Sequence, residues 1–457
     1  MRTGVWFLLI AILTFPLIAA EPFAGVDAAV MDVLAKTGAP SASVAVVQDG
    51  RLAFARAYGL ANVATKTAAS SEMRYSIGSI SKQFTAASLL LLAEEGRVSL
   101  DDRVIRWMPE LTRAGDVTIR QLLSMTSGYQ DFWPQDYVMP GMLEDVTAER
   151  ITNDWAKKPL DFEPGSKWQY SNTNYVIAGR IVERASGMPF FEFLQKRILI
   201  PLGMTSARDS DQAALGAEDP MRYHRYGLAP VRVAPKEGRG WMYAAGELAM
   251  TASDLAKWDM AMIERKLLRP ESWDEMQREV MLTSGAGTRY GLGVGIATVD
   301  GRRVISHGGE VSGFTARNEV YPDHRAAIVV LTNIDATDAA SQIATKIATP
   351  LFAANDPGRQ QALDASKAIF ADLQRGKVDR SLFTPNANAY FSAEAIQDFA
   401  ATLRPLGTPK EFTQAAQSLR GGMTARRYRV VTPSKTLRIS TFWMPDGKLE
   451  QYIVTAD

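Results

Sequence analysis

Ser79 and Lys82 form the only Ser-x-x-Lys motif of the chain, and these residue types can act together as nucleophile and base. The motif lies where a strand-like run, Met73 to Ile77, passes through Gly78 into an apolar helical pattern, Phe84 to Glu95. Residues three apart on a helix share a face, so the hydroxyl and the amine can touch. A helix N-terminus also offers free N–H groups and partial positive charge. The pattern therefore favours attack by a serine on a carbonyl, with stabilisation of the resulting oxyanion.

Tyr170 and Asn172, two residues apart, form a second candidate pair. In an extended segment or tight loop, both side chains can point to one side. A phenol beside an ammonium has its ionised form favoured, and a desolvated amine loses its proton more easily. Either Tyr170 or Lys82 can then relay a proton from Ser79 to a leaving group.

A third candidate element, His307-Gly308-Gly309, follows a strand-like run from Arg303 to Ser306. Paired glycines let a substrate backbone approach a strand edge, which can bind an extended acyl group through main-chain hydrogen bonds. The imidazole of His307 can bind a substrate carboxylate or tune the proton relay.

Each element taken alone has a simpler explanation. A chain this long contains about one Ser-x-x-Lys motif by chance, and Ser79 can merely cap a helix while Lys82 is solvated. Tyr170 can pack in a core beside an Asn172 in a turn. His307 can be incidental to a glycine-rich turn. The case for catalysis therefore depends on the three elements occurring together.

The surrounding elements predict how these residues are positioned. Ser43 to Tyr58 reads as a hairpin around an Asp49-Gly50 turn, and strand patterns return from Gly291 to Asn333. Residues 79 to 265 between them are mainly helical in pattern. This order predicts an α+β fold, with one sheet built from both ends and a helical region inserted between them. The meeting point of two such regions is a common place for a site.

Composition excludes several classes of protein. Residues 1–20 read as a signal peptide, which predicts an exported, periplasmic or secreted protein; an uncleaved membrane anchor is the alternative. The chain has no cysteine, so disulfides and thiolate sites are excluded. It carries 51 basic and 50 acidic side chains without a long basic stripe, which argues against nucleic acid. Three histidines without paired spacing argue against a metal.

The last hundred residues predict a separate small α+β domain. A loop-forming segment at 353–358 precedes helical patterns at 359–374 and 392–403 and strands at 423–431, 436–443 and 448–454. The expected division is therefore a signal peptide at 1–20, a main domain at 21–354 that carries the three candidate elements, and a C-terminal domain of unknown role at 355–457. Five of its aromatic side chains are expected in its core: Phe391, Tyr428, Phe442, Trp443 and Tyr452.

With all three elements in order, the chain resembles the serine β-lactamase and penicillin-recognising hydrolase superfamily. The likeness covers about residues 25 to 350 and is nearest to the class C and D-alanyl-D-alanine carboxypeptidase type. It implies a β-lactamase/transpeptidase-like antiparallel sheet flanked by helices. The segments that carry it, beyond the three motifs, are Tyr75 to Ser79, Gln121 to Gly128, Glu163-Pro164-Gly165, Pro201 to Thr205, Ala245-Gly246, Thr251 to Leu255 and Tyr290 to Gly293.

The resemblance also implies roles for single residues and no cofactor. Ser79 would be the acylated nucleophile, while Lys82 and Tyr170 would share the work of general base and acid. The backbone N–H groups of Ser79 and Glu310 would form the oxyanion hole. The residues expected to contact the substrate are Asn172, His307, Gly308, Gly309 and Glu310.

One departure from the family pattern affects the expected substrate. Members that act on β-lactams usually carry Lys-Thr-Gly where this chain has His307-Gly308-Gly309. The fixed ammonium that would grip a substrate carboxylate is missing. We therefore expect a hydrolase that cleaves an ester or amide bond of a small-molecule or peptide substrate through an acyl-enzyme, with weak or no β-lactamase activity. The alternatives are a D-alanyl-D-alanine carboxypeptidase or D-aminopeptidase-like enzyme, and a non-catalytic binding protein. Loops such as 132–144 would determine which acyl groups are accepted. Three aromatic side chains, Trp133, Tyr137 and Trp241, either line a pocket or only pack against the protein core.

Overall fold

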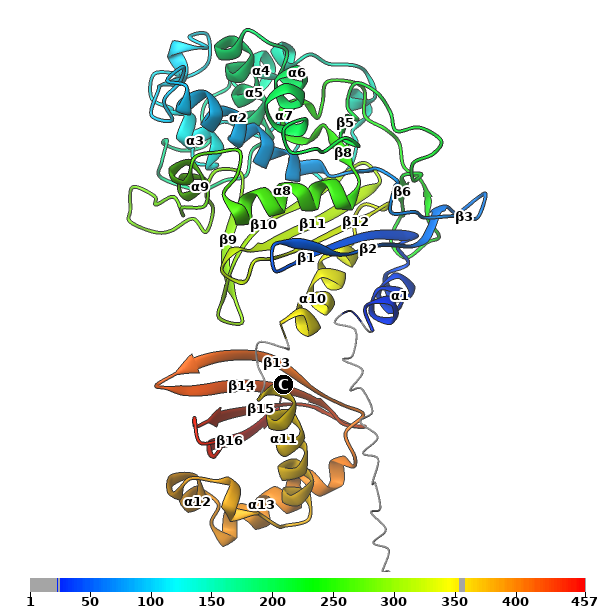
Figure 1. Cartoon of the computed structure of the whole chain (residues 1–457), viewed down its shortest axis with the longest axis vertical. Coiled ribbons are helices and arrows are strands. Elements are labelled where there is room, and N and C mark those ends of the chain that lie inside the picture. Colours follow the sequence, from blue (N-terminus) through cyan, green and yellow to red (C-terminus); the bar gives the residue numbers. More distant parts are fainter. Residues whose placement is uncertain (1–22, 24, 353–357, 457) are drawn as a thin grey trace, which may run out of the picture.

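The computed structural model describes residue 23 and residues 25–352 and 358–456 (Figure 1). The expected signal peptide at 1–20 and most of the expected linker lie outside the described residues. Within the described ranges, no helix is both long enough and apolar enough to cross a bilayer.

Within the described chain, seven antiparallel strands form the main sheet, in the order β3-β2-β1-β12-β11-β10-β9. β1 joins the two halves of the sheet, because it pairs with β2 on one side and with β12 on the other. The expected sheet built from two distant segments is therefore confirmed. The strands are β1 (Ser41–Gln48), β2 (Arg51–Asn62), β3 (Thr67–Ala68), β9 (Gly295–Val299), β10 (Arg302–Val311), β11 (Phe314–Tyr321) and β12 (Ala326–Thr332).

The central strands are covered on both faces. Val44 of β1 packs in the same apolar cluster as α1 (Val26–Thr37) and α10 (Ala339–Leu351). Its neighbour Ala45 packs in the opposite cluster, which includes α8 (Ala252–Glu264). Because successive side chains of a strand point to opposite faces, a strand covered on both sides must be apolar throughout. This explains why every residue of β12 is buried. Figure 1 shows α8 on one side of the sheet and α1 with α10 on the other.

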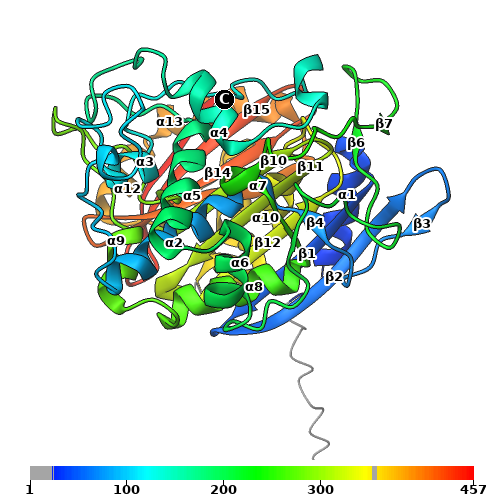
Figure 2. The ribbon, with the colours of Figure 1, turned by 90° about the horizontal axis from the view of Figure 1, so that it is seen from above.

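The inserted region between β3 and β9 is mainly helical. α2 (Lys82–Glu94) is buried along almost its whole length, as expected for a helix without a polar face. α5 (Asn172–Ser186) packs on it and ends at Gly187, whose left-handed φ of 74° favours glycine. Figure 2 shows both helices over the strands of the main sheet. The other elements are α3 (Ile119–Leu123), α4 (Ala148–Trp155), α6 (Phe190–Leu194), α7 (Tyr243–Gly246), α9 (Pro270–Met276), β4 (Tyr75–Ser76), β5 (Arg208–Asp209), β6 (Tyr223–His224), β7 (Arg232–Val233) and β8 (Leu248–Met250).

Residues 358–456 have an apolar cluster of their own, drawn only from positions 363 to 454. A four-stranded antiparallel sheet packs on helices there, and its first strand, β13, was not predicted. Of the expected core aromatics, all but Phe442 belong to the cluster; Phe442 lies instead under the guanidinium of Arg420. The domain division at residue 354 stays a prediction. The elements are α11 (Arg359–Gln374), α12 (Pro385–Tyr390), α13 (Ala393–Leu403), β13 (Glu411–Arg420), β14 (Met423–Val431), β15 (Thr436–Trp443) and β16 (Leu449–Ala456).

Two local expectations need correction. His307-Gly308-Gly309 does not follow a strand that ends at Ser306, because β10 continues through the glycines to Val311. Ser79 does not lie on a regular α-helix but on a 3₁₀ turn, Gly78–Ser81, that leads directly into α2. The three-residue spacing still brings Ser79 and Lys82 together, since side chains three apart nearly eclipse one another in a 3₁₀ turn.

Candidate active site

The turn that carries Ser79 is held between the two regions of the fold. The N–H of Ile77 donates to the carbonyl of Leu248 in β8 at 2.9 Å. Gly78 then adopts a left-handed φ of 51°, and a Cβ at this position would lie 2.8 Å from the backbone nitrogen of Glu310. Only glycine therefore allows the turn to make this conformation while lying so close to β10.

Lys82 lies directly behind the Ser79 hydroxyl and is completely buried. Its Nζ donates to Ser79 Oγ at 2.8 Å, to Asn172 Oδ1 at 2.8 Å and to the carbonyl of Ala245 at 2.7 Å. Burial lowers the pKa of Lys82 to about 7, against the opposing charge of Asp131. A large fraction of the amine is thus unprotonated near neutral pH, which suits a general base.

Tyr170 contacts the same hydroxyl from another direction, and its OH donates to Ser79 Oγ at 2.7 Å. Burial raises the pKa of Tyr170, the hydrogen bond with Ser79 opposes this shift, and the charge of Asp131 adds to it. Lys82 Nζ lies 5.0 Å from the centroid of the Tyr170 ring. The phenol therefore keeps its proton, as a general acid must.

Asn172 is the first residue of α5, and its contacts explain its orientation. While its carbonyl oxygen accepts from Lys82, its backbone N–H and Nδ2 donate to Asp131 at 2.9 and 3.3 Å. Burial raises the pKa of Asp131, and hydrogen bonds from Trp133 and Asn172 oppose this shift. Asp131 thus fixes the orientation of the Asn172 amide, so that its oxygen and not its nitrogen faces Lys82.

Two roles were considered for His307, binding a substrate carboxylate and tuning the proton relay, and its surroundings bear on the first. The OH of Tyr290 lies 2.9 Å from its Nε2, and the carbonyl of Gly308 lies 2.5 Å from its Nδ1. Burial, together with the charge of Lys82, lowers the pKa of His307 to about 4, so the imidazole is neutral. With both ring nitrogens engaged and no charge, His307 is poorly suited to bind a carboxylate.

The two glycines of this element differ in their surroundings. A Cβ at Gly309 would lie 1.9 Å from the carbonyl oxygen of Ile77, so the absence of a side chain at Gly309 admits the turn that carries Ser79. Gly308 is exposed, and a Cβ there would meet nothing closer than 3.8 Å. Gly309 is therefore the position that sets the distance between β10 and the Ser79 turn.

β10 presents a partly free edge beside Ser79. β9 pairs with β10 only from Arg302 to Ser306, so the stretch from His307 to Val311 has no β9 partner. The backbone nitrogen of Glu310 lies in this stretch and next to Gly78. The Glu310 carboxylate accepts from the N–H of Ala336 at 2.7 Å. The edge can accept an extended substrate backbone, and Glu310 can offer an N–H close to the serine.

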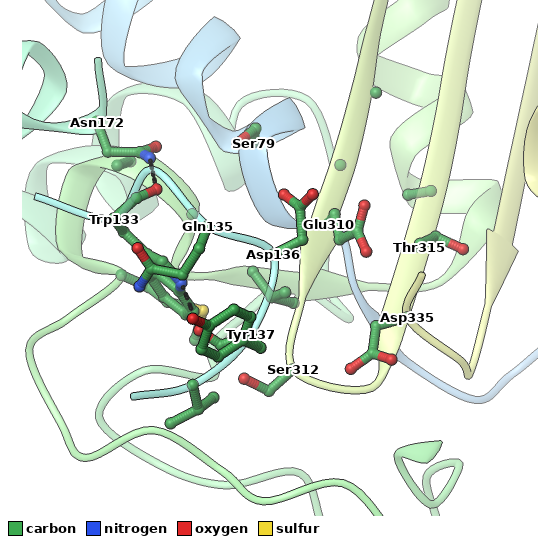
Figure 3. A pocket seen from close by; sticks show the side chains of 18 of the residues that line it. Ser79, Trp133, Gln135, Asp136, Tyr137, Asn172, Glu310, Ser312, Thr315 and Asp335 are labelled. Atoms are coloured by element: carbon green, nitrogen blue, oxygen red, sulfur yellow. Dashed lines mark hydrogen bonds between the residues drawn. The ribbon is translucent and has the colours of Figure 1, made fainter. Parts of the chain in front are cut away.

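Ser79 opens into a cavity of about 870 Å³ between β10 and the loop at 131–138 (Figure 3). Trp133, Tyr137 and Trp241, which were expected either to line a pocket or to pack, all line this cavity. Trp241 also packs at 6.0 Å, centroid to centroid, on the ring of Phe132. Within the described residues, no group of three or more metal-binding side chains occurs. The site thus brings a serine hydroxyl, a buried amine and a buried phenol together at the wall of a large cavity.

The model of the Beta-lactamase family matches residues 26–349, which include every residue of this site. The chain belongs to that family. It is therefore a member of a group of serine hydrolases, as the motifs indicated. The expected likeness to the class C type stays a prediction.

Two curated relatives extend the comparison. Penicillin-binding protein 4* of Bacillus subtilis (strain 168) is 25% identical over 394 residues, which cover 83% of this chain and 84% of that protein. Protein flp of Staphylococcus aureus (strain COL) is 27% identical over 322 residues. That match covers 68% of this chain but only 63% of Protein flp.

Solved structures show the same fold. A D-stereospecific amidohydrolase from Streptomyces sp. has a TM-score of 0.61 and 28% identity, covering 69% of this chain and 96% of its own. The octameric penicillin-binding protein homologue from Pyrococcus abyssi has a TM-score of 0.63 at 22% identity and covers 94% of this chain and 99% of its own. D-amino acid amidase from Ochrobactrum anthropi SV3 has a TM-score of 0.65 at 23% identity, covering 73% and 99%.

Sequence reasoning missed several groups that support the site of this β-lactamase family member. Asp131 carried no motif, and its role follows only from its hydrogen bonds to Asn172. Tyr290 was noted only as part of a family-like segment, and its contact with His307 was not foreseen. Glu247 is buried, and both carboxylate oxygens lack a hydrogen-bond partner among the described residues. Burial raises the pKa of Glu247 strongly, which favours a neutral carboxyl group near Lys82.

Proposed function

We propose that this protein hydrolyses an amide or ester bond through an acyl-enzyme on Ser79. The observation that carries the proposal is the convergence of two proton-transfer groups on one hydroxyl. Lys82 Nζ lies 2.8 Å and Tyr170 OH lies 2.7 Å from Ser79 Oγ. Both distances are within reach for proton transfer. A purely structural serine has no need of a buried amine and a buried phenol together.

The surroundings of Lys82 favour it as the base for acylation. A neutral amine has two N–H groups and one lone pair. Asn172 Oδ1 and the carbonyl of Ala245 can accept the two N–H groups, and the lone pair then faces the Ser79 hydroxyl. As Oγ bonds to the substrate carbonyl carbon, its proton passes to Lys82. The carbonyl oxygen gains the negative charge and is stabilised by the N–H groups of Ser79 and Glu310.

Tyr170 then completes the acylation step. Its proton is retained at neutral pH, so the phenol can protonate the leaving nitrogen or oxygen as the bond to the carbonyl carbon breaks. The proton on Lys82 replaces the one that Tyr170 has lost. Water afterwards attacks the Ser79 ester, and its proton is accepted by the same groups, which frees the acid product and restores the serine.

Amide or ester substrates are favoured over β-lactams. His307 replaces the expected lysine and carries no charge, so a β-lactam carboxylate finds no fixed cation at that position. The D-stereospecific amidohydrolase that shares this fold at 28% identity supports an amidase or aminopeptidase-like activity. Hydrolysis of nitrocefin at the rate of a proficient β-lactamase would contradict this preference.

Export is part of the proposal and rests on residues 1–20, whose basic start and apolar run fit a signal peptide. Cleavage would release the enzyme outside the cytoplasm, whereas an uncleaved segment would anchor it. N-terminal sequencing of the protein from the cell envelope and the medium distinguishes these two outcomes.

Intact mass after treatment with a fluorophosphonate tests the mechanism. Wild type should gain a single adduct, and Ser79→Ala should gain none. Ser76→Ala is a matched control, because Ser76 is buried three residues away and bonds to Ser210 outside the cavity; it should label like wild type. No adduct on folded wild type would instead favour a non-catalytic binding protein.

A further inference from the structure

The cavity in front of Ser79 is acidic. Its lining includes four carboxylates, Asp131, Asp136, Glu310 and Asp335, whereas no lysine or arginine lines it among the described residues. The chain as a whole carries 51 basic and 50 acidic side chains, so the imbalance belongs to the cavity and not to the protein. Of the two histidines in the lining, His307 is neutral.

Three of these carboxylates converge from separate elements. Asp136 lies on the loop at 131–138, Glu310 on β10 and Asp335 just after β12. Figure 3 shows Asp136 beside Glu310, and the Glu310 carboxylate lies on the side toward Asp335. Burial raises the pKa of Glu310, and the negative charges of Asp136 and Asp335 raise it further. The three groups therefore interact across the cavity.

The protein itself leaves this charge largely uncompensated. Glu310 accepts one backbone N–H from Ala336, and Asp335 accepts one from Gly313 at 3.0 Å. No ion pair to Asp136, Glu310 or Asp335 is found in the part of the chain that the structure describes. Burial raises the pKa of Asp335, and the hydrogen bond from Gly313 and the nearby His224 oppose this shift. Like charges facing one cavity repel each other, and a cation in the cavity relieves that repulsion.

We propose that this cavity selects substrates that carry an ammonium group on the acyl side of the scissile bond. The inference rests on the proposed hydrolase function of Ser79 and specifies its substrate class. Glu310 places the negative charge of the cavity close to Ser79, because its backbone nitrogen lies next to Gly78 while its carboxylate lines the cavity. An acyl group that pairs with the free edge of β10 places its amino group near these carboxylates.

Aromatic side chains in the cavity wall indicate a second property of the substrate. Trp133, Tyr137 and Trp241 line the same cavity, and Tyr137 is 67% exposed and free to contact a ligand. A positive group beside a hydrophobic or aromatic side chain fits this combination. Amides or esters of amino acids with a free amino group belong to this class. Carboxylate-bearing peptides and β-lactams face repulsion instead.

A set of substrates matched except for charge tests the proposal. D-phenylalanine 4-nitroanilide carries an ammonium, its N-acetyl derivative is neutral and its N-succinyl derivative is anionic. We expect kcat/KM for the free amine to exceed that for the neutral compound by roughly tenfold or more, with the anionic compound lowest. Equal values, or the reverse order, would overturn the proposal.

Variants assign the preference to particular carboxylates. Asp136→Asn and Asp335→Asn should each lower the advantage of the free amine over the neutral compound several-fold. Asp338→Asn is the control, since Asp338 is exposed, bonds to Gln342 and does not line the cavity; it should preserve the advantage. An unchanged ratio in both cavity variants would refute the assignment, and thermal unfolding shows that each variant is folded.

Fluorophosphonate labelling separates failure of this inference from failure of the hydrolase proposal. If wild type labels at Ser79 but hydrolyses none of the three anilides, the charge preference is tested by how well non-hydrolysed amides protect Ser79 from labelling. D-phenylalaninamide should then protect at concentrations several-fold lower than N-acetyl-D-phenylalaninamide, and equal protection overturns only the charge preference. If folded wild type neither labels nor hydrolyses any anilide, both proposals fall.

Discussion

Replacing Gly309 by alanine tests whether the close approach of β10 to the nucleophile turn creates the oxyanion site. The new Cβ would lie 1.9 Å from the carbonyl oxygen of Ile77 and 2.8 Å from its carbon. Non-bonded atoms attract at about 3.5–4.0 Å, so β10 and the turn would have to separate by more than ~1 Å. Both contacts are backbone atoms, which cannot turn aside as a flexible side chain can.

The expected loss follows from the position of Glu310, one residue further along β10. Moving its N–H away from Ser79 removes one oxyanion donor, and such a loss costs about 10²–10³ in rate, or roughly 3–4 kcal/mol. Overpacking should also lower the free energy of unfolding by ~1–3 kcal/mol. Gly308→Ala is the comparison, because its Cβ meets only Ala316 O at 3.8 Å; we expect a loss of less than about tenfold there.

The second-order rate constant for fluorophosphonate labelling, followed by intact mass, measures this effect without assuming a substrate. Urea unfolding of both variants measures the cost in stability. Similar labelling rates for Gly309→Ala and Gly308→Ala, with both proteins folded, would show that the contact with Ile77 does not position the oxyanion site.

Two further predictions concern pH. Below about pH 7 the amine of Lys82 is protonated and cannot accept the Ser79 proton, so kcat/KM for a neutral ester should fall with a midpoint near that pH. Burial lowers the Lys82 pKa while the Asp131 carboxylate opposes this, so Asp131→Asn should shift the midpoint to lower pH; a fixed midpoint speaks against Lys82 as the base. Burial also raises the pKa of Asp259 from its ordinary value of 3.8 to about 8, although hydrogen bonds from Asn318 oppose this shift. The folded state binds this proton more tightly than the unfolded state does. Protonated Asp259 therefore makes its full contribution to the free energy of unfolding below about pH 4, and this contribution is lost as the pH rises through about 8. Urea unfolding should therefore show wild type losing stability more steeply than Asp259→Asn over this range, and parallel profiles would contradict the assignment.

Local patterns in the sequence were enough to predict many of the elements. The Asp49-Gly50 turn between two β-rich runs predicted the β1–β2 hairpin, and helical and strand periodicity predicted the bounds of α11 and β14. The association of Ser79, Lys82, Tyr170 and Asn172 came from motif order together with the family resemblance. These features depend on neighbours in sequence or on a pattern that many relatives share.

Other features depend on contacts that no local pattern contains. Asp131 acts through Asn172, 41 positions away, and no spacing rule connects them. The continuation of β10 through two glycines runs against strand propensity, and it occurs because β11 pairs with that stretch and Gly309 must admit Ile77. The raised pKa of Tyr170 also has no signal in the local sequence, because it comes from burial by the folded chain.

The pairing of β1 with β12 has a consequence for how the chain acquires its structure. Val44 lies opposite Val330, so the central strand of the sheet gains its second neighbour only after most of the chain has been made. At about 5–20 residues per second, the apolar faces of the first hairpin stay uncovered for roughly ten seconds to a minute during synthesis. Long-range strand pairing is also slow in itself. We therefore expect slow folding that benefits from a holding chaperone, with aggregation most pronounced for chains that stop short of residue 326.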